Sequence, residues 1–152
     1  MSTDKKVTSD VMKTLEDGKE GFEKAARLLE QDAPTVSATF LRLSRQRNSF
    51  YDELQELAKD YGDSIEEDGT VAAALHRGWM KVKDALSGSD AEGVLDAAVQ
   101  GEEHAVNVYE DALESSDISP ELRGVLVRQM GDVVKACSEV TALRAAHTVK
   151  AG

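Results

Sequence analysis

The stretch FLRLSRQRNSF, residues 40–50, lies in the middle of a long run of residues with helical periodicity. Side chains in and around it recur at spacings of three and four residues, namely Val36, Phe40, Leu43, Arg47, Phe50, Leu54 and Leu57. At about 100° per residue they share one face of an α-helix, which is the pattern of a helix packed into a bundle. One of them is an arginine, so the sequence predicts a charged guanidinium group in the core of a helical bundle.

The composition outside this stretch indicates one helical domain. The chain has 152 residues, which is enough for a real hydrophobic core, and only 2 of them are proline. Good helix formers such as alanine, leucine, glutamate and lysine dominate. We therefore expect a single domain over residues 1–152.

The charge balance narrows the class of partner. Lysine and arginine number 18 against 29 aspartates and glutamates, a net charge of -11, which argues against nucleic-acid and anionic-membrane partners. The single cysteine, Cys137, excludes an internal disulfide bond. No apolar run approaches the roughly 18 residues that cross a bilayer, and no apolar segment follows residues 1–6 as a secretion signal would require. These features predict a cytoplasmic protein.

Five helices are expected, over residues 9–30, 34–61, 70–86, 90–115 and 119–148. Pro34 marks one helix start, and Ser119-Pro120-Glu121 marks another. The connection between the second and fourth of these helices is too long for a hairpin loop, and it suits a parallel return along the bundle. Gly18 lies on the apolar stripe of the first helix, where glycine costs about 1 kcal/mol, so it predicts the close approach of a neighbouring helix.

Several short stretches together are similar to one protein family. They are LEDGKEGF at 15–22, QRNSF at 46–50, ALHRGWM at 74–80, GEEHAVNVYE at 101–110, PELR at 120–123 and Arg128-Gln129. In these stretches the chain resembles the ferritin-like superfamily and, more narrowly, an uncharacterised bacterial branch of it that is classed as a domain of unknown function. The resemblance implies an all-α, ferritin-like up-down four-helix bundle with a long crossover that carries a short extra helix.

The metal chemistry of that superfamily does not transfer to this sequence. It requires a glutamate from each of two helices and a Glu-x-x-His motif from each of the other two. The histidines here are His76, His104 and His147, and three residues before them stand Ala73, Gly101 and Arg144. Without this ligand pattern we expect no di-metal site, no cofactor and no catalytic residues.

A polar core cluster is predicted in place of the metal site. If Arg47 points inward it needs an acceptor, because an unpaired buried charge is very costly. Glu102 at the edge of one apolar stripe and Gln129 inside another are the predicted partners, with Gln46 as an alternative member. The competing interpretation is that the helix is rotated so that Arg47 reaches the surface.

A second predicted feature lies in the crossover. His76 and Trp79 are three residues apart on the predicted short helix, where they would frame a small pocket. The alternative is that this pair simply packs the crossover against the bundle.

These patterns favour a non-enzymatic helical-bundle protein, stress-related by family association. One alternative is a di-iron or di-manganese carboxylate protein with atypical ligands, acting in metal storage or as an oxidoreductase. Another is a small-ligand binder whose pocket lies between the crossover helix and the bundle. A homodimer is the macromolecular assembly that we keep open.

Overall fold

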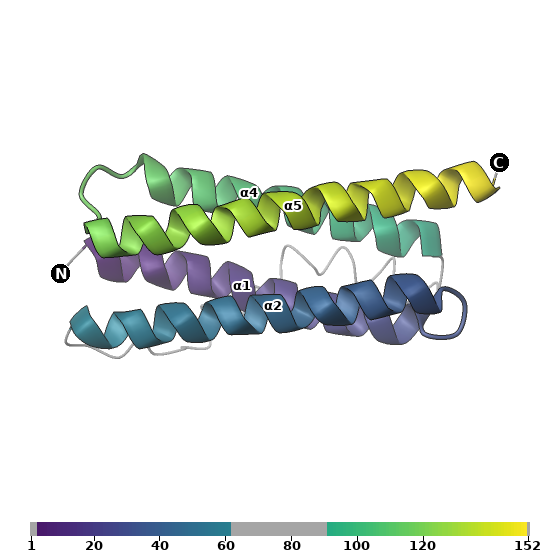
Figure 1. Cartoon of the computed structure of the whole chain (residues 1–152), viewed down its shortest axis with the longest axis horizontal. Helices are drawn as coiled ribbons and strands as arrows, with labels where there is room; N and C mark the ends of the chain where they lie inside the picture. Colours follow the sequence, from purple (N-terminus) through teal and green to yellow (C-terminus); the bar gives the residue numbers. More distant parts are fainter. Residues whose placement is uncertain (1–2, 62–90, 152) are drawn as a thin grey trace.

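The computed structural model describes residues 3–61 and 91–151, and every regular element within these ranges is helical. The elements are α1 (Thr3–Leu29), α2 (Pro34–Ala58), the 3-10 helix η1 (Lys59–Tyr61), α4 (Ala91–Glu114) and α5 (Pro120–Ala151). The described part of the chain is therefore all-α, with four long helices arranged as a bundle (Figure 1).

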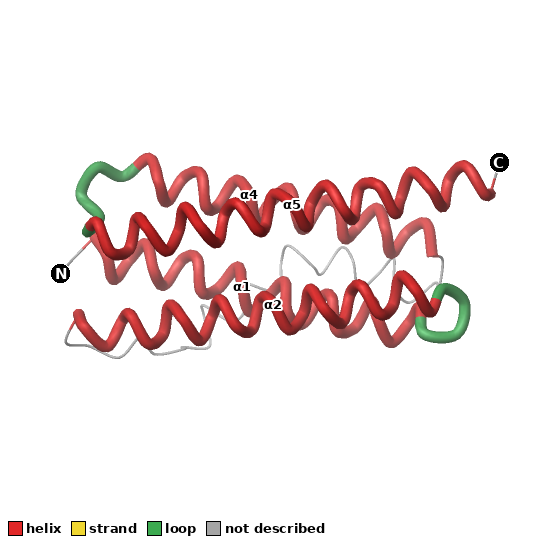
Figure 2. The backbone as a smooth tube through the Cα atoms, in the orientation of Figure 1, coloured by secondary structure: helices red, strands yellow, loops and turns green. Residues whose placement is uncertain are grey.

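The long helices form two antiparallel hairpins, α1 with α2 and α4 with α5 (Figure 1). The loops that join each pair lie at opposite ends of the bundle (Figure 2). Consequently α2 and α4 run in the same direction, and the order of helix directions is up-down-down-up. Helix α1 also packs against α4, and α2 contacts α5, so α2 and α4 lie diagonally opposite each other.

The connection between α2 and α4, including the helix predicted over 70–86, lies outside the described residues.

One predicted helix boundary was wrong. Helix α1 begins at Thr3 and not at residue 9, because its first turns take part in tertiary structure. The carboxylate of Asp4 accepts a hydrogen bond of 2.8 Å from the backbone N–H of Ser119 in the α4–α5 loop, and Thr8 is fully buried. Because residues 3–8 are mostly polar, their sequence does not predict the bond of Asp4 or the burial of Thr8.

The starts of α2 and α5 follow from local chemistry. Pro34 occupies the first turn of α2, where its missing N–H costs nothing. The hydroxyl of Ser119 accepts a hydrogen bond from the backbone N–H of Leu122 and so caps α5. Arg123 then donates to the carbonyls of Leu113 and Ser115, which satisfies acceptors at the C-terminal end of α4.

Buried serines hold α1 and α2 together. Ser37 donates a 2.6 Å hydrogen bond to the carbonyl of Ala26, and Ser44 donates a 2.9 Å bond to the carbonyl of Lys19. Short side chains that bond to a neighbouring backbone allow two helices to approach closely. At Gly18 the atoms nearest to the space of a Cβ belong to the Arg47 side chain of α2, so the glycine leaves room for that side chain.

The apolar core is divided into two clusters along the bundle. One cluster contains Phe22 and Phe40, whose ring centroids are 5.3 Å apart, and it fills the end near the α1–α2 loop. The other contains Leu15, Leu54 and Leu126 and fills the opposite end. The buried polar side chains of Arg47 and Glu102 lie between the two clusters, at the centre of the bundle. Among the described helices, none is long and apolar enough to span a membrane.

Candidate functional site

An ion pair between Arg47 and Glu102 crosses the centre of the bundle. Arg47 of α2 is 1% exposed and Glu102 of α4 is 0% exposed. The two guanidinium nitrogens Nη1 and Nη2 donate to the two carboxylate oxygens at 2.5 and 2.6 Å. This bidentate geometry is the strongest arrangement that a guanidinium and a carboxylate can adopt. Because α2 and α4 lie diagonally opposite, the pair joins the two hairpins through the core.

Neighbouring residues make room for the arginine and complete its contacts. A Cβ atom at Gly18 would lie 3.4 Å from Arg47 Nη1 and 3.6 Å from its Cγ, so the glycine faces the arginine side chain. The guanidinium carbon lies 5.4 Å from the centroid of the Phe22 ring, within cation–π range. Arg47 Nε donates a long 3.4 Å bond to Gln46 Oε1. Arg47 is therefore held on several sides and does not reach the surface.

Gln129 is buried but does not join this ion pair, contrary to the predicted cluster. Its Oε1 accepts a 2.8 Å hydrogen bond from the Tyr109 hydroxyl, and its Nε2 donates to Glu53 Oε1 at 2.8 Å and to the Phe50 carbonyl at 3.3 Å. Glu53 also receives a hydrogen bond from Arg128. Tyr109 follows Glu102 by seven residues, a rise of about 10 Å along α4, and Phe50 follows Arg47 by three residues, so this second group lies further along the bundle.

The second polar group has its own electrostatic signature. Burial raises the pKa of Tyr109 above its ordinary value, the nearby Arg47 lowers it, and the acidic Glu53 and Glu102 raise it. The Tyr109 hydroxyl therefore stays protonated and remains a hydrogen-bond donor to Gln129. Sequence reasoning missed Tyr109 and Glu53, although Tyr109 stands seven residues from Glu102 and so lies near the same helix face.

The residues at the bundle centre do not fit a di-metal site. Both oxygens of Glu102 accept hydrogen bonds from Arg47, and a guanidinium has no lone pair to offer a metal. Within residues 3–61 and 91–151, no three histidine, cysteine, aspartate or glutamate side chains lie together in a way that would hold a metal ion. The donor set is that of a closed salt bridge.

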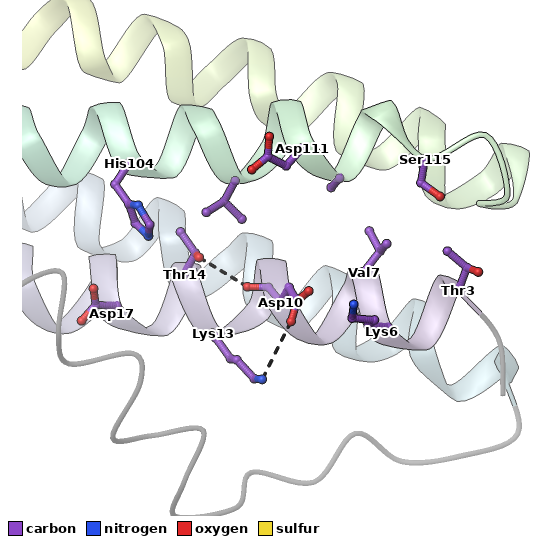
Figure 3. A pocket seen from close by; sticks show the side chains of 12 residues that line it. Thr3, Lys6, Val7, Asp10, Lys13, Thr14, Asp17, His104, Asp111 and Ser115 are labelled. Atoms are coloured by element: carbon purple, nitrogen blue, oxygen red, sulfur yellow. Dashed lines mark hydrogen bonds and ion pairs between the residues drawn. The ribbon is translucent and has the colours of Figure 1, made fainter.

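A pocket on the surface between α1 and α4 contains a site residue that the sequence analysis did not identify. Asp17 of α1 lines it and is only 6% exposed, and its Oδ1 atom has no hydrogen-bond partner. The side chain of His104 enters the same pocket from α4 (Figure 3). Asp17 precedes Gly18 on the buried side of α1. Its position beside the apolar stripe is the feature of the sequence that could have identified it as a buried carboxylate.

The remaining candidates are placed differently. His76 and Trp79, the predicted crossover pocket, lie outside the described residues. Cys137 is half-buried, and burial raises the pKa of its thiol, with Glu102 and Glu103 acting in the same direction. A raised pKa disfavours the nucleophilic thiolate.

Comparison with known proteins finds one family. Residues 6–115 match the family model of DUF2383, a domain of unknown function. The match covers more than half of the chain and includes Arg47, Glu102, Asp17 and Tyr109. No protein of curated function matches the chain.

Proposed function

The chain belongs to the DUF2383 family, and we propose that it is a non-enzymatic, ferritin-like bundle protein in which a salt bridge replaces the metal site. The observation that carries this proposal is the buried bidentate pair between Arg47 and Glu102. It occupies the middle of the bundle, where ferritin-like proteins with metal chemistry place their carboxylate ligands. The bundle then serves as a rigid scaffold whose function lies on its surface.

Electrostatics support the absence of metal chemistry at this position. A unit positive charge 4 Å from the Arg47 guanidinium would be repelled by about 4 kcal/mol at an effective dielectric constant of 20, and a divalent ion by twice as much. Glu102 would also have to give up both of its hydrogen bonds to coordinate an ion. Breaking a buried pair in this way typically costs 3–5 kcal/mol.

The decisive experiment is metal loading of the purified full chain. The protein is incubated without oxygen with ferrous iron, and separately with manganese, and the bound metal is counted by mass spectrometry after desalting. We expect far less than one ion per chain, while a di-iron carboxylate protein loaded in parallel retains two. Two ions per chain in this protein, lost in Glu102→Gln, would instead establish a di-iron or di-manganese protein with atypical ligands.

Three further elements of the proposal come from the family resemblance and the composition. They are a cytoplasmic location in a bacterium, a stress-related role and assembly as a homodimer. Sedimentation of the purified chain over a range of concentrations tests the last of these. A small-ligand site at His76 and Trp79 remains a prediction from the sequence.

A further inference from the structure

The pocket between α1 and α4 is separate from the central ion pair. It has a volume of about 520 Å³ and is lined by the outer faces of these two helices. Asp17, Thr14 and His104 lie at one end of it, while Asp10 of α1 and Asp111 of α4 line its middle (Figure 3). Val7, Val108 and Ala112 add apolar surface to the lining.

Asp17 is the side chain that indicates a ligand. It is 94% buried, yet its Oδ1 has no hydrogen-bond donor. Buried polar atoms are nearly always hydrogen-bonded, because an acceptor that is removed from water without gaining a donor costs free energy. A group that enters the pocket with N–H donors would satisfy this oxygen.

The electrostatics of the Asp17 carboxyl group favour pairing with a cation. The pKa of Asp17 is raised from 3.8 to about 7, first by burial and then by the nearby Glu20, while Lys24 acts in the opposite direction. The other ionisable groups of the pocket are Asp10, Lys13 and Lys6 on the same helix and His104 and Asp111 on α4. Lys13 lies 3.9 Å from Asp10 and pairs with that residue, so it does not neutralise Asp17.

A metal ion is a poor candidate for this cation. No three histidine, cysteine, aspartate or glutamate side chains of the described chain are grouped for coordination, and this includes the side chains of the pocket. A volume of about 520 Å³ is instead in the range of small-molecule sites. The apolar part of the lining suits a hydrocarbon chain attached to the charged group.

We propose that the α1–α4 pocket binds a small organic cation, a primary ammonium group on a short aliphatic chain, and that the ammonium group pairs with the Asp17 carboxylate. The aliphatic chain lies over Val108 and Ala112. Lys6, at the other end of the pocket, is positioned to receive a carboxylate if the ligand carries one at its far end.

Three six-carbon probes distinguish the contribution of the ammonium group to binding from that of the carboxylate. Hexylamine carries the ammonium group alone, 6-aminohexanoate carries both charges, and hexanoate carries the carboxylate alone. Titration calorimetry on the full chain at pH 8, where Asp17 is ionised, should show saturable binding of the two amines and none of hexanoate. Tighter binding of 6-aminohexanoate than of hexylamine would identify a zwitterionic ligand, and the reverse order a simple amine.

Asp17→Asn is the variant that tests the contact. It keeps the shape of the side chain and removes its charge, so amine affinity should fall about tenfold or more. Asp52→Asn removes one charge from an exposed position on α2 and should leave the affinity unchanged. A thermal melt of each variant verifies that it is folded.

A second measurement is independent of affinity. Near pH 7, amine binding should release a proton from Asp17, and titrations in two buffers of different ionisation enthalpy detect this release. It should persist in Asp52→Asn and disappear in Asp17→Asn. The proposal is overturned if neither amine binds saturably, if hexanoate binds as tightly as hexylamine, or if a folded Asp17→Asn variant retains the original affinity. Metal loading of the bundle centre has no bearing on these outcomes, so the two proposals fail separately.

Discussion

Removing one partner of the central ion pair should destabilise the protein far more than removing both. Arg47→Met keeps a long side chain but leaves the Glu102 carboxylate buried at 0% exposure without its two donors. Glu102→Gln leaves the guanidinium without a counter-charge. Each single substitution should lower the free energy of unfolding by about 3–5 kcal/mol, which is the typical cost of an uncompensated buried charge.

The double variant, Arg47→Met with Glu102→Leu, removes both charges. Replacement of a buried ion pair by apolar side chains of similar volume is often neutral or stabilising, so its stability should lie within about 2 kcal/mol of the parent protein. The non-additivity of the single and double variants then gives a coupling energy of several kcal/mol between the two positions. Urea unfolding followed by circular dichroism measures all of these values, provided that the m-value is unchanged.

An exposed ion pair provides the matched control. Arg42 and Glu139 also join two helices at 2.5 Å, but their side chains are 56% and 42% exposed. Arg42→Met and Glu139→Gln should each cost less than about 1 kcal/mol, because solvent screens the pair. The reasoning about the bundle centre is refuted if Arg47→Met is as mild as Arg42→Met, since that result would mean that the guanidinium is hydrated.

Three further predictions follow from single contacts. Gly18→Ala should raise the free energy of unfolding by up to about 1 kcal/mol, because the added Cβ meets Arg47 at ordinary contact distance. Gly18→Leu should lower it by about 1–3 kcal/mol, because the larger side chain collides with Arg47. At Gly131 an added Cβ would meet no atom within 4 Å, so urea unfolding should not show this change of sign between alanine and leucine. The pKa of Asp17 is raised from 3.8 to about 7, so the stability that its neutral carboxyl contributes is complete below pH 4 and is lost as the pH rises through 7. This loss reaches up to about 4 kcal/mol, and unfolding curves from pH 4 to 8 should show it in the parent but not in Asp17→Asn. Tyr109→Phe should cost about 1–3 kcal/mol in urea, because it leaves the buried Gln129 Oε1 without its donor; an unchanged midpoint would contradict the bond.

Periodicity in the sequence was sufficient to identify the helical hairpins and the faces that they bury. Arg47 stands at a helical spacing from Phe40, Leu43 and Phe50, and the structure places its guanidinium among the core residues. Glu102 at the edge of its stripe was a sound choice of partner, since an arginine in the core needs a carboxylate. The length of the connection after α2 also indicated that α2 and α4 run in parallel, which Figure 1 shows.

Periodicity does not determine the axial register of one helix relative to another. It predicted that Gln129 faces inward, but Gln129 bonds to Tyr109 and Glu53 and not to the Arg47–Glu102 pair. The start of α1 was misplaced for a related reason, because Asp4 is held by a contact with the distant Ser119. Axial register results from packing between hairpins, and no local pattern encodes it.

The amino-acid sequence by itself therefore determined where the four long helices lie, apart from the first turns of α1, which faces they bury and that a charge lies in the core, because these depend on intervals of three and four residues along one chain. Only the tertiary structure decided which polar groups meet, since that depends on how two hairpins slide and rotate against each other. The same holds for Asp17, whose burial and unpaired Oδ1 arise in the folded chain and are not encoded by its spacing along α1.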